Sequence, residues 1–362
     1  SCTVTAAAEA DLRQSIRQAA RRNTALRTVV TGCAAATDQG DIRALPSVTN
    51  VIAGANLEAV ALALDLPRES ASIVATHQTG ARALLRIQDG CDEHCTFCLT
   101  TIARGANRSR PIPDILHEAR HLAEHHHEIV ITGIHIGTYG ADIGTSLSVL
   151  LQCLIETIPD VRFRLSSVEA TELDETLHRL FADPRRLVPY LHAPLQSASN
   201  RVLKRMGRHW YTAESYADAI TTLVSTRRTF GLSADVIAGF PGETESDHEA
   251  TLAFIDRLPF TALHVFPFSL RPGTPAAHLP NPVPSATITR RAEELRALAH
   301  TKSTSYRHHR TGTQADIVTL GSGSHRSGLT EDYLTIPVDP TLPRGMRFTG
   351  IVPEVAVGRD LG

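Results

Sequence analysis

The chain has 362 residues, enough for two or three domains of ordinary size, with 42% hydrophobic and 20% charged residues. This composition excludes disordered and collagenous proteins. The formal charge of −2 argues against a protein that coats nucleic acid through its overall charge, but leaves room for local basic surfaces. No apolar run approaches the roughly 18 residues of a membrane helix, and no signal peptide begins the sequence. We therefore expect a cytoplasmic protein with no membrane partner.

The first part of the sequence, residues 1–75, predicts a small α/β domain. Residues 6–22 have the spacing of an amphipathic helix, with arginines repeated every four residues. Residues 26–31 form a short β-branched run that ends just before Cys33, and residues 50–66 supply a second strand and helix. Cys33 is therefore expected where a strand gives way to a loop.

Residues 80–278 predict a partial (βα)6 barrel. Six short apolar runs alternate with helical stretches, and each is followed by glycine or polar residues. This alternation implies parallel strands with right-handed crossovers and a functional rim at their carboxyl ends. The expected strands are residues 83–87, 128–132, 161–166, 190–193, 233–238 and 262–269.

The end of the chain predicts a connecting helix and a small β domain. Residues 279–312 include a helical stretch at 288–307, and residues 313–362 alternate short strands with turns. This last segment is slightly acidic. Any RNA binding by it would depend on shape and a few arginines.

Three cysteines follow the first expected barrel strand: Cys91, Cys95 and Cys98. In a chain without a secretion signal, such a group favours metal or redox chemistry over disulfides. Thiolates bind the irons of cubane clusters, and three on one loop leave the fourth iron open to a substrate or cofactor. The alternatives are a zinc site completed by His94, or three unrelated thiols.

The Cys-x3-Cys-x-aromatic-Cys loop resembles the signature of radical S-adenosylmethionine enzymes, and its flanking residues resemble the methylthiotransferase branch. Similar segments run along the whole chain, at residues 130–133, 164–169, 194–197, 201–206, 239–243 and 271–274. One departure is Ala198, where the family usually has glycine. The C-terminal segment resembles the TRAM domain, a small β-barrel of many RNA-modifying enzymes.

The resemblance implies two iron–sulfur clusters. A [4Fe-4S] cluster on the three cysteines of the loop would bind S-adenosylmethionine at its open iron and reduce it to a radical, with electrons from a reducing donor. An auxiliary [4Fe-4S] cluster would deliver the methylated sulfur. Cys2 and Cys33 match the second and third of its three cysteine ligands, and the first would lie upstream. Because the chain begins with Ser1 rather than Met, we expect that its natural N-terminus is missing.

The resemblance also suggests which residues contact the cofactor. Phe97 would pack near the adenine and Gly133 near the methionine moiety, although an aromatic residue beside a cluster also excludes water and a glycine also serves a bare turn. Further candidates for cofactor or substrate contacts follow later strands of the barrel: Ser167, Glu169, Gln196 and Asp235.

Two basic groups lie near the expected rim. Four residues at helical spacing would form one basic helix face: Arg201, Lys204, Arg205 and Arg208. Three more follow the cysteine loop: Arg104, Arg108 and Arg110. A charged stripe is often only a solvated helix face, but two such groups on one face favour an anionic partner such as RNA phosphate.

The opening residues resemble the branch of the family that acts on tRNA carrying N6-threonylcarbamoyladenosine. The implied reaction is methylthiolation at carbon 2 of that base, beside the anticodon. The partner would be a tRNA anticodon loop, whose bases are unpaired, and not DNA. Within the family, the alternatives are N6-isopentenyladenosine in tRNA and an aspartate of a ribosomal protein. Outside it, the alternative is a non-catalytic iron–sulfur or zinc protein that binds RNA.

Overall fold

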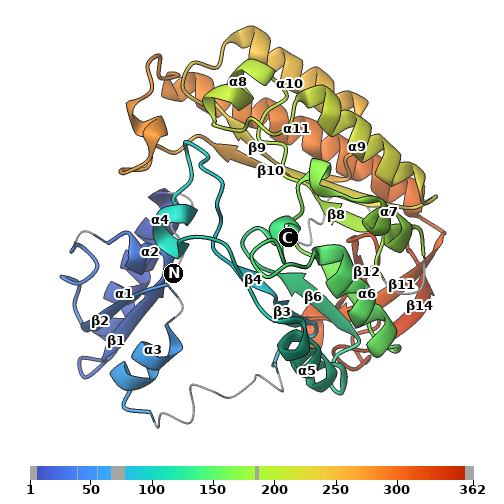
Figure 1. Ribbon diagram of the computed structural model, residues 1–362, viewed down its shortest axis with the longest axis horizontal. Helices are drawn as coiled ribbons and strands as arrows, with labels where there is room; N and C mark the ends of the chain where they lie inside the picture. Colours follow the sequence, from blue (N-terminus) through green and yellow to red (C-terminus); the bar gives the residue numbers. More distant parts are fainter. Residues whose placement is uncertain (1–5, 39, 55, 67–77, 184–186, 355–362) are drawn as a thin grey trace.

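The computed structural model describes residues 6–38, 40–54, 56–66, 78–183 and 187–354 (Figure 1). A small N-terminal unit is followed by a curved parallel sheet with helices outside it, then by a long helix and an antiparallel sheet. The expected mixed α/β class is therefore confirmed. In the described part of the chain, no helix is both long and apolar enough to cross a bilayer.

The N-terminal unit is built around two parallel strands, β1 and β2. The expected helix at residues 6–22 is present as α1, which packs on a small apolar core that includes Ile16 and Val30. Helix α2 begins at Cys33, directly after β1. The elements are α1 (Ala6–Arg22), β1 (Thr28–Gly32), α2 (Cys33–Ala36), β2 (Val48–Ala53) and α3 (Leu57–Ala63).

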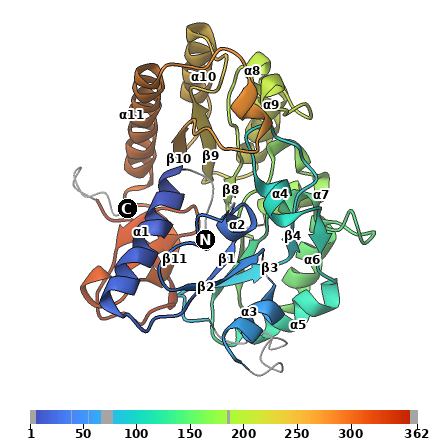
Figure 2. The ribbon, with the colours of Figure 1, turned by 90° about the vertical axis from the view of Figure 1, so that its left-hand side faces the viewer.

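Six parallel strands form the partial barrel, and they follow one another in chain order. Strands β3, β6 and β7 form one sheet and β8, β9 and β10 another, and single bridges such as Ser167 to His192 join β7 to β8. In Figures 1 and 2 these strands form an open arc, and the N-terminal unit lies on its open side. The bounds are β3 (Ala83–Arg86), β6 (Glu128–Thr132), β7 (Arg162–Leu165), β8 (Tyr190–His192), β9 (Gly231–Ala238) and β10 (Ala262–Pro267).

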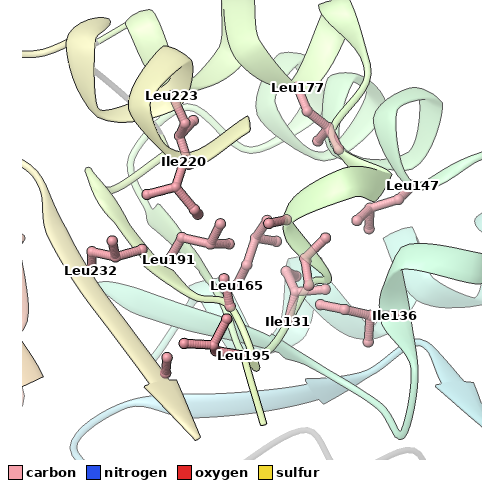
Figure 3. Packing of buried hydrophobic residues seen from close by; sticks show 14 of the residues in the cluster. Ile131, Ile136, Leu147, Leu165, Leu177, Leu191, Leu195, Ile220, Leu223 and Leu232 are labelled. Carbon is pink, nitrogen blue, oxygen red and sulfur yellow. The ribbon is translucent and has the colours of Figure 1, made fainter. Parts of the chain in front are cut away.

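Most barrel strands carry a run of buried apolar side chains, because helices cover the outside of the sheet. Leucine and isoleucine side chains from strands and helices meet in one core, with Leu165 and Leu191 packed under Ile220 and Leu223 (Figure 3). Polar residues at the N-cap positions of several helices accept backbone N–H groups and fix where each helix begins. The covering helices are α5 (Ile112–Ala123), α6 (Leu147–Thr157), α7 (Glu175–Ala182), α8 (Asn200–Arg205), α9 (Ala213–Ser225) and α10 (Glu245–Arg257).

The C-terminal part differs from one expectation. Helix α11 leads into four antiparallel strands in the order β13-β12-β11-β14. In the described residues β13 and β14 are edges that do not pair with each other, so the expected C-terminal β-barrel is an open sheet here. Their bounds, with that of the helix, are α11 (Ser285–Arg310), β11 (Gln314–Leu320), β12 (Ser327–Thr330), β13 (Thr335–Pro337) and β14 (Arg347–Ile351).

A buried ion network joins this sheet to the N-terminal ends of the barrel strands. Arg162 Nε donates to Glu128 Oε2 at 2.6 Å, and Arg164 Nε donates to Glu128 Oε1 at 2.9 Å. Arg162 also donates to the Asp316 carbonyl at 2.6 Å, and Arg164 to the Thr330 carbonyl at 3.1 Å. Glu128 has no exposed surface. The C-terminal sheet therefore covers the end of the barrel opposite the functional rim.

Candidate active site

The three cysteines lie on one loop at the carboxyl end of the barrel. The loop leaves β4 (Gln88–Asp89) and enters α4 (Thr100–Arg104). The backbone N–H of Cys98 donates to the Cys95 carbonyl at 3.1 Å, and that of Cys91 donates to the Gly105 carbonyl at 3.0 Å. All three are free, partly buried thiols. The fold thus places all three thiols on one loop, although among the described side chains their sulfur atoms do not form a group already within 4.8 Å of one another.

Gln88 ties the cysteine loop to the loop after β6. Its buried amide donates to the Gly90 carbonyl at 2.6 Å and accepts the His135 backbone N–H at 2.9 Å. Gly133 packs against the same amide, because a Cβ there would stand 2.9 Å from Gln88 Oε1 and 2.7 Å from Ile136 Cγ2. Gly133 is thus required for close packing at the rim.

Two of the thiols have polar neighbours suited to a negatively charged sulfur. His135 Nδ1 lies 3.6 Å from Cys91 Sγ, and the Thr100 backbone N–H donates to Cys98 Sγ at 3.3 Å. His135 also contacts Glu172 through Nε2 at 2.7 Å. Sequence reasoning did not select His135, although its place two residues after Gly133 puts it on the rim.

Arg208 and Glu169 form a buried pair beside the third thiol. Arg208 contacts the Glu169 carboxylate and lies 3.5 Å from Cys95 Sγ. Burial raises the pKa of Cys95 to about 12, although the Arg208 charge opposes the shift. Burial thus disfavours a free thiolate at Cys95. Burial also raises the pKa of Glu169, and its Oε2 is buried without a hydrogen-bond partner in the described structure.

The predicted basic helix face is wrong at Arg208. Helix α8 ends at Arg205, and Gly207 takes a φ of 78°, which turns the chain inward. Arg208 is 5% exposed and points to the cysteine loop instead of the solvent. Among the other residues of the predicted basic face, Arg205 donates to the Pro241 carbonyl at 3.0 Å.

A cavity of about 150 Å³ opens next to the cysteine loop, at the carboxyl ends of β9 and β10. Phe97, Gln196 and Asp235 meet there, and Phe97 packs edge-on against Phe240 with ring centroids 6.4 Å apart. Ser167 lies after β7, outside the lining of this cavity. The complete lining is Phe97, Gln196, Asp235, Ile237, Phe266, Pro267, Phe268 and Ser269.

In the segment after β8, the left-handed backbone conformation lies at Gln196 and not at Ala198, the position where the family usually has glycine. Gln196 takes the left-handed conformation with a φ of 63°, whereas Ala198 is not among the described residues with positive φ. Gln196 is held there by its carbonyl, which accepts the Ile237 N–H at 2.9 Å, and by its own N–H, which donates to the Asp235 carbonyl at 2.8 Å. The strained backbone conformation therefore lies at Gln196, which lines the cavity.

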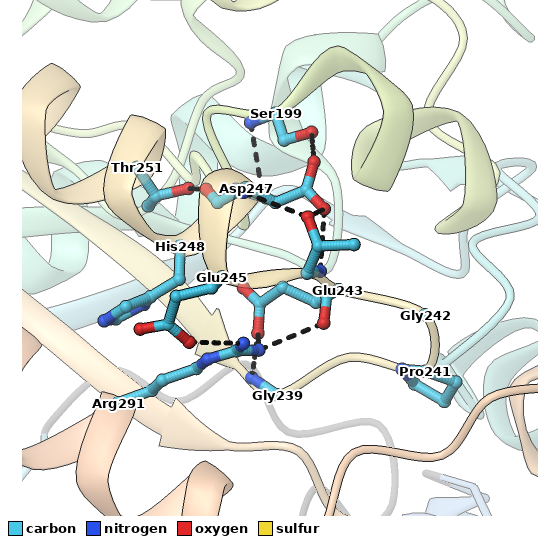
Figure 4. A network of polar contacts seen from close by, with 12 residues as sticks. Ser199, Gly239, Pro241, Gly242, Glu243, Glu245, Asp247, His248, Thr251 and Arg291 are labelled. Atoms are coloured by element: carbon cyan, nitrogen blue, oxygen red, sulfur yellow. Dashed lines mark hydrogen bonds and ion pairs between the residues drawn. The ribbon is translucent and has the colours of Figure 1, made fainter.

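The loop after β9 is fixed by the helices that follow it (Figure 4). Glu243 accepts the Gly239 N–H at 2.6 Å and Arg291 Nη1 at 2.9 Å. Asp247 accepts the Ser199 hydroxyl at 2.6 Å. These contacts join β9, α8, α10 and α11 behind the cavity, so this part of the rim is rigid.

The second group of cysteines is described only in part. Cys2 lies outside the described residues. Cys33 begins α2, and Arg104 Nε donates to its sulfur at 3.3 Å. Since Arg104 lies on α4, which follows Cys98 closely, Cys33 is placed near the cysteine loop.

The basic residues after the loop have different environments. Arg110 pairs with Glu118 at 2.7 Å, and Arg104 is partly buried, whereas 59% of the Arg108 side chain is exposed. Arg86, 49% exposed, lies near Arg108. Both line a hollow of about 390 Å³ with Asn56, Gln88, Asp89, Ser109 and Arg110.

Gly90→Ala is expected to disrupt the cysteine loop. Gly90 has a φ of 78°, and a Cβ would stand 1.9 Å from the Ala106 carbonyl oxygen, so the backbone would have to move. Gly144→Ala is the matched control, because Gly144 has a φ of 71° with nothing within 4 Å of its Cβ position. We expect iron incorporation to fall severalfold in Gly90→Ala only. Equal iron content in the two variants would contradict this account of the loop.

Comparisons with known proteins bear on the family of the chain. Residues 85–255 match the Radical SAM superfamily. The chain is 37% identical over 318 residues to "Threonylcarbamoyladenosine tRNA methylthiotransferase MtaB" of Bacillus subtilis, covering 82% of this chain and 70% of that protein. The protein of the same name from Thermotoga maritima is 32% identical, covering 88% and 76%.

A relative with a different name is also similar. The "tRNA-2-methylthio-N(6)-dimethylallyladenosine synthase" of Erythrobacter litoralis is 32% identical over 268 residues, covering 72% of this chain and 60% of that protein. The matches to proteins named MtaB extend over more of the chain. With its cysteine loop at the rim of six parallel strands, the chain belongs to the family of radical SAM tRNA methylthiotransferases.

Proposed function

We propose that this chain transfers a methylthio group to carbon 2 of N6-threonylcarbamoyladenosine, beside the anticodon of tRNA, in the cytoplasm. The observation that carries the proposal is the placement of Cys91, Cys95 and Cys98 on one loop, whose Phe97 lines the cavity, in a chain 37% identical to a threonylcarbamoyladenosine tRNA methylthiotransferase. The partly buried thiols and their polar neighbours suit cluster binding.

We propose that the three cysteines hold a [4Fe-4S] cluster that binds S-adenosylmethionine. When bound, this group supplies the radical chemistry that activates the substrate carbon. Phe97 packs on the cofactor's adenine at the cavity wall. Glu169, whose Oε2 is free of protein partners in the described structure, accepts a hydrogen bond from the cofactor.

The remaining candidate contacts lie on the same rim. Gly133 lets the backbone come close to the methionine moiety, and Gln196 reaches the cavity from its left-handed turn. Ser167 contacts the cofactor from the end of β7. These residues bind and orient the cofactor, and the buried Arg208 holds Glu169 in place.

We propose that Cys33 is one ligand of an auxiliary [4Fe-4S] cluster, with Cys2 as another. Arg104 supports this role, because its N–H group points at the Cys33 sulfur from the helix that follows the first cysteine loop. A positive charge at that sulfur stabilises a thiolate. A reducing donor supplies the electrons.

We propose that exposed arginines beside the site contact the RNA backbone. Arg86 and Arg108 line the hollow next to the cysteine loop and contact Asp89 at 3.5 and 3.9 Å, and their side chains are 49% and 59% exposed, so that phosphates can reach them. An anticodon loop presents its base without breaking a duplex, so a target base can enter the cavity from such a docked loop.

The substrate is tested with two anticodon stem-loop RNAs. One carries N6-threonylcarbamoyladenosine, and the other carries N6-isopentenyladenosine, which is also called N6-dimethylallyladenosine. The full-length protein is reconstituted anaerobically with iron, sulfide, reductant and S-adenosylmethionine, and the nucleosides are analysed by mass spectrometry. We expect the methylthio product only from the first RNA. Product only from the second would leave the chemistry intact and overturn the substrate assignment.

A further inference from the structure

Three side chains inside the barrel bring metal-binding atoms together, away from the cysteines. His192 lies on β8, Asp235 on β9 and His264 on β10, and their ligand atoms all lie within 4.8 Å of one another. Asp235 and His264 are direct partners in the β9–β10 register. Three adjacent parallel strands therefore fix the positions of these residues.

The His192 ring is oriented by hydrogen bonds from behind. Its Nδ1 lies 2.8 Å from Ser233 Oγ, which in turn lies 2.6 Å from the buried Tyr190 hydroxyl. Its Nε2 faces the cluster and lies 3.3 Å from Asp235 Oδ1. A metal-binding histidine usually has its second ring nitrogen held in this way by a polar partner.

We propose that His192, Asp235 and His264 bind one divalent transition-metal ion. Two imidazoles and one carboxylate on one side of a metal form a ligand set that leaves other coordination positions open. Metal–ligand bonds of about 2.1 Å place neighbouring ligand atoms roughly 3–3.5 Å apart, the separation His192 and Asp235 already have. His264 is exposed, so its side chain can rotate to complete the set.

The proposed site borders the cavity, because Asp235 belongs both to the ligand set and to the cavity lining. The site is separate from the cysteine loop in both its elements and its ligand chemistry, since thiolates favour softer ions, whereas imidazole suits ions such as Fe²⁺ and Zn²⁺ and carboxylate suits Mn²⁺. The inference therefore does not depend on methylthio transfer.

Mn²⁺ alone is the probe, added to the full chain with its iron–sulfur clusters already in place. Mn²⁺ is titrated into the protein, and the electron paramagnetic resonance signal of the free ion reports how much remains unbound. We expect one ion bound per chain. Pulsed spectra of the bound ion should show coupling to imidazole nitrogen. Absence of saturable binding, or bound Mn²⁺ without nitrogen coupling, would overturn the proposal.

Variants test which residues bind. His264→Ala and Asp235→Asn are each expected to weaken Mn²⁺ binding at least tenfold, while His300→Ala, an exposed histidine on α11, leaves it unchanged. Iron content of each variant reports whether its fold and clusters are intact. Unchanged Mn²⁺ affinity in His264→Ala would contradict the proposed ligand set, because His264 would then not be a ligand and only the contact between His192 and Asp235 would remain.

Discussion

Cys95→Ala is expected to abolish reductive cleavage of S-adenosylmethionine. The cysteine loop has only three thiols for the cluster, and the Cys95 sulfur is the one beside the buried Arg208–Glu169 pair. Changes to the surroundings of metal ligands already cost about 10–100-fold, so loss of a ligand should cost more. After anaerobic reconstitution, the variant should lack the visible absorbance of the cluster and form no 5′-deoxyadenosine.

Cys153→Ala is the matched control for this experiment. Cys153 is a free, partly buried thiol on α6, outside the cysteine loop. We expect it to keep the iron content and cleavage rate of the unmodified chain. Cleavage by Cys95→Ala at a comparable rate would contradict the assignment of the cluster ligands.

Glu128→Gln is expected to lower the free energy of unfolding by about 3–5 kcal/mol, the range for breaking a buried ion pair. Its carboxylate contacts both Arg162 and Arg164, whose side chains are each 1% exposed. The neutral amide removes a buried counterion from both guanidinium groups and leaves Arg162 its contact with Asp316 at 3.2 Å. Because the same arginines donate to backbone carbonyls of the C-terminal sheet, that sheet should detach from the barrel first. Urea unfolding and limited proteolysis measure the two effects.

An exposed pair provides the control for Glu128. Arg27 and Asp65 lie 3.1 Å apart with side chains 62% and 76% exposed, so Asp65→Asn should cost less than about 1 kcal/mol. Similar losses in the two variants would show that burial of the Glu128 network has no special role in stability.

The same carboxylate predicts a pH dependence. Burial opposes ionisation of Glu128, but Arg164 and Arg162 hold its pKa well below the ordinary 4.5. A carboxyl group with a lowered folded pKa adds stability above its unfolded pKa, and this stability is lost as the pH falls. The unmodified chain should therefore lose more stability than Glu128→Gln when the pH falls below about 4.5.

The arrangement of the barrel follows from local sequence patterns. The run Glu128–Thr132 is apolar and β-branched, as a strand covered on both sides must be, and it becomes β6 with the expected bounds. The spacing of Cys91, Cys95 and Cys98 likewise predicted that they share one loop, because residues close together in the sequence are placed by local geometry. Contacts within a segment can be predicted from that segment.

The contacts that the sequence did not predict join distant segments. Arg208 was assigned to a helix face because its spacing fits, but Gly207 ends that regularity and a buried carboxylate 39 residues away attracts the side chain. Charges within the apolar strand β7, at Arg162 and Arg164, were a signal of buried pairing. Their partner Glu128 and the backbone carbonyls that they bind become apparent only with the fold.

The most direct test of the account is nucleoside mass spectrometry of tRNA from bacteria that lack their own methylthiotransferases and express the full-length gene. We predict the appearance of 2-methylthio-N6-threonylcarbamoyladenosine, and its absence when Cys95→Ala is expressed at the same level. The methylthio derivative of isopentenyladenosine in its place would contradict the substrate assignment. Unmodified tRNA from cells whose protein cleaves S-adenosylmethionine would contradict the assignment of tRNA as the substrate.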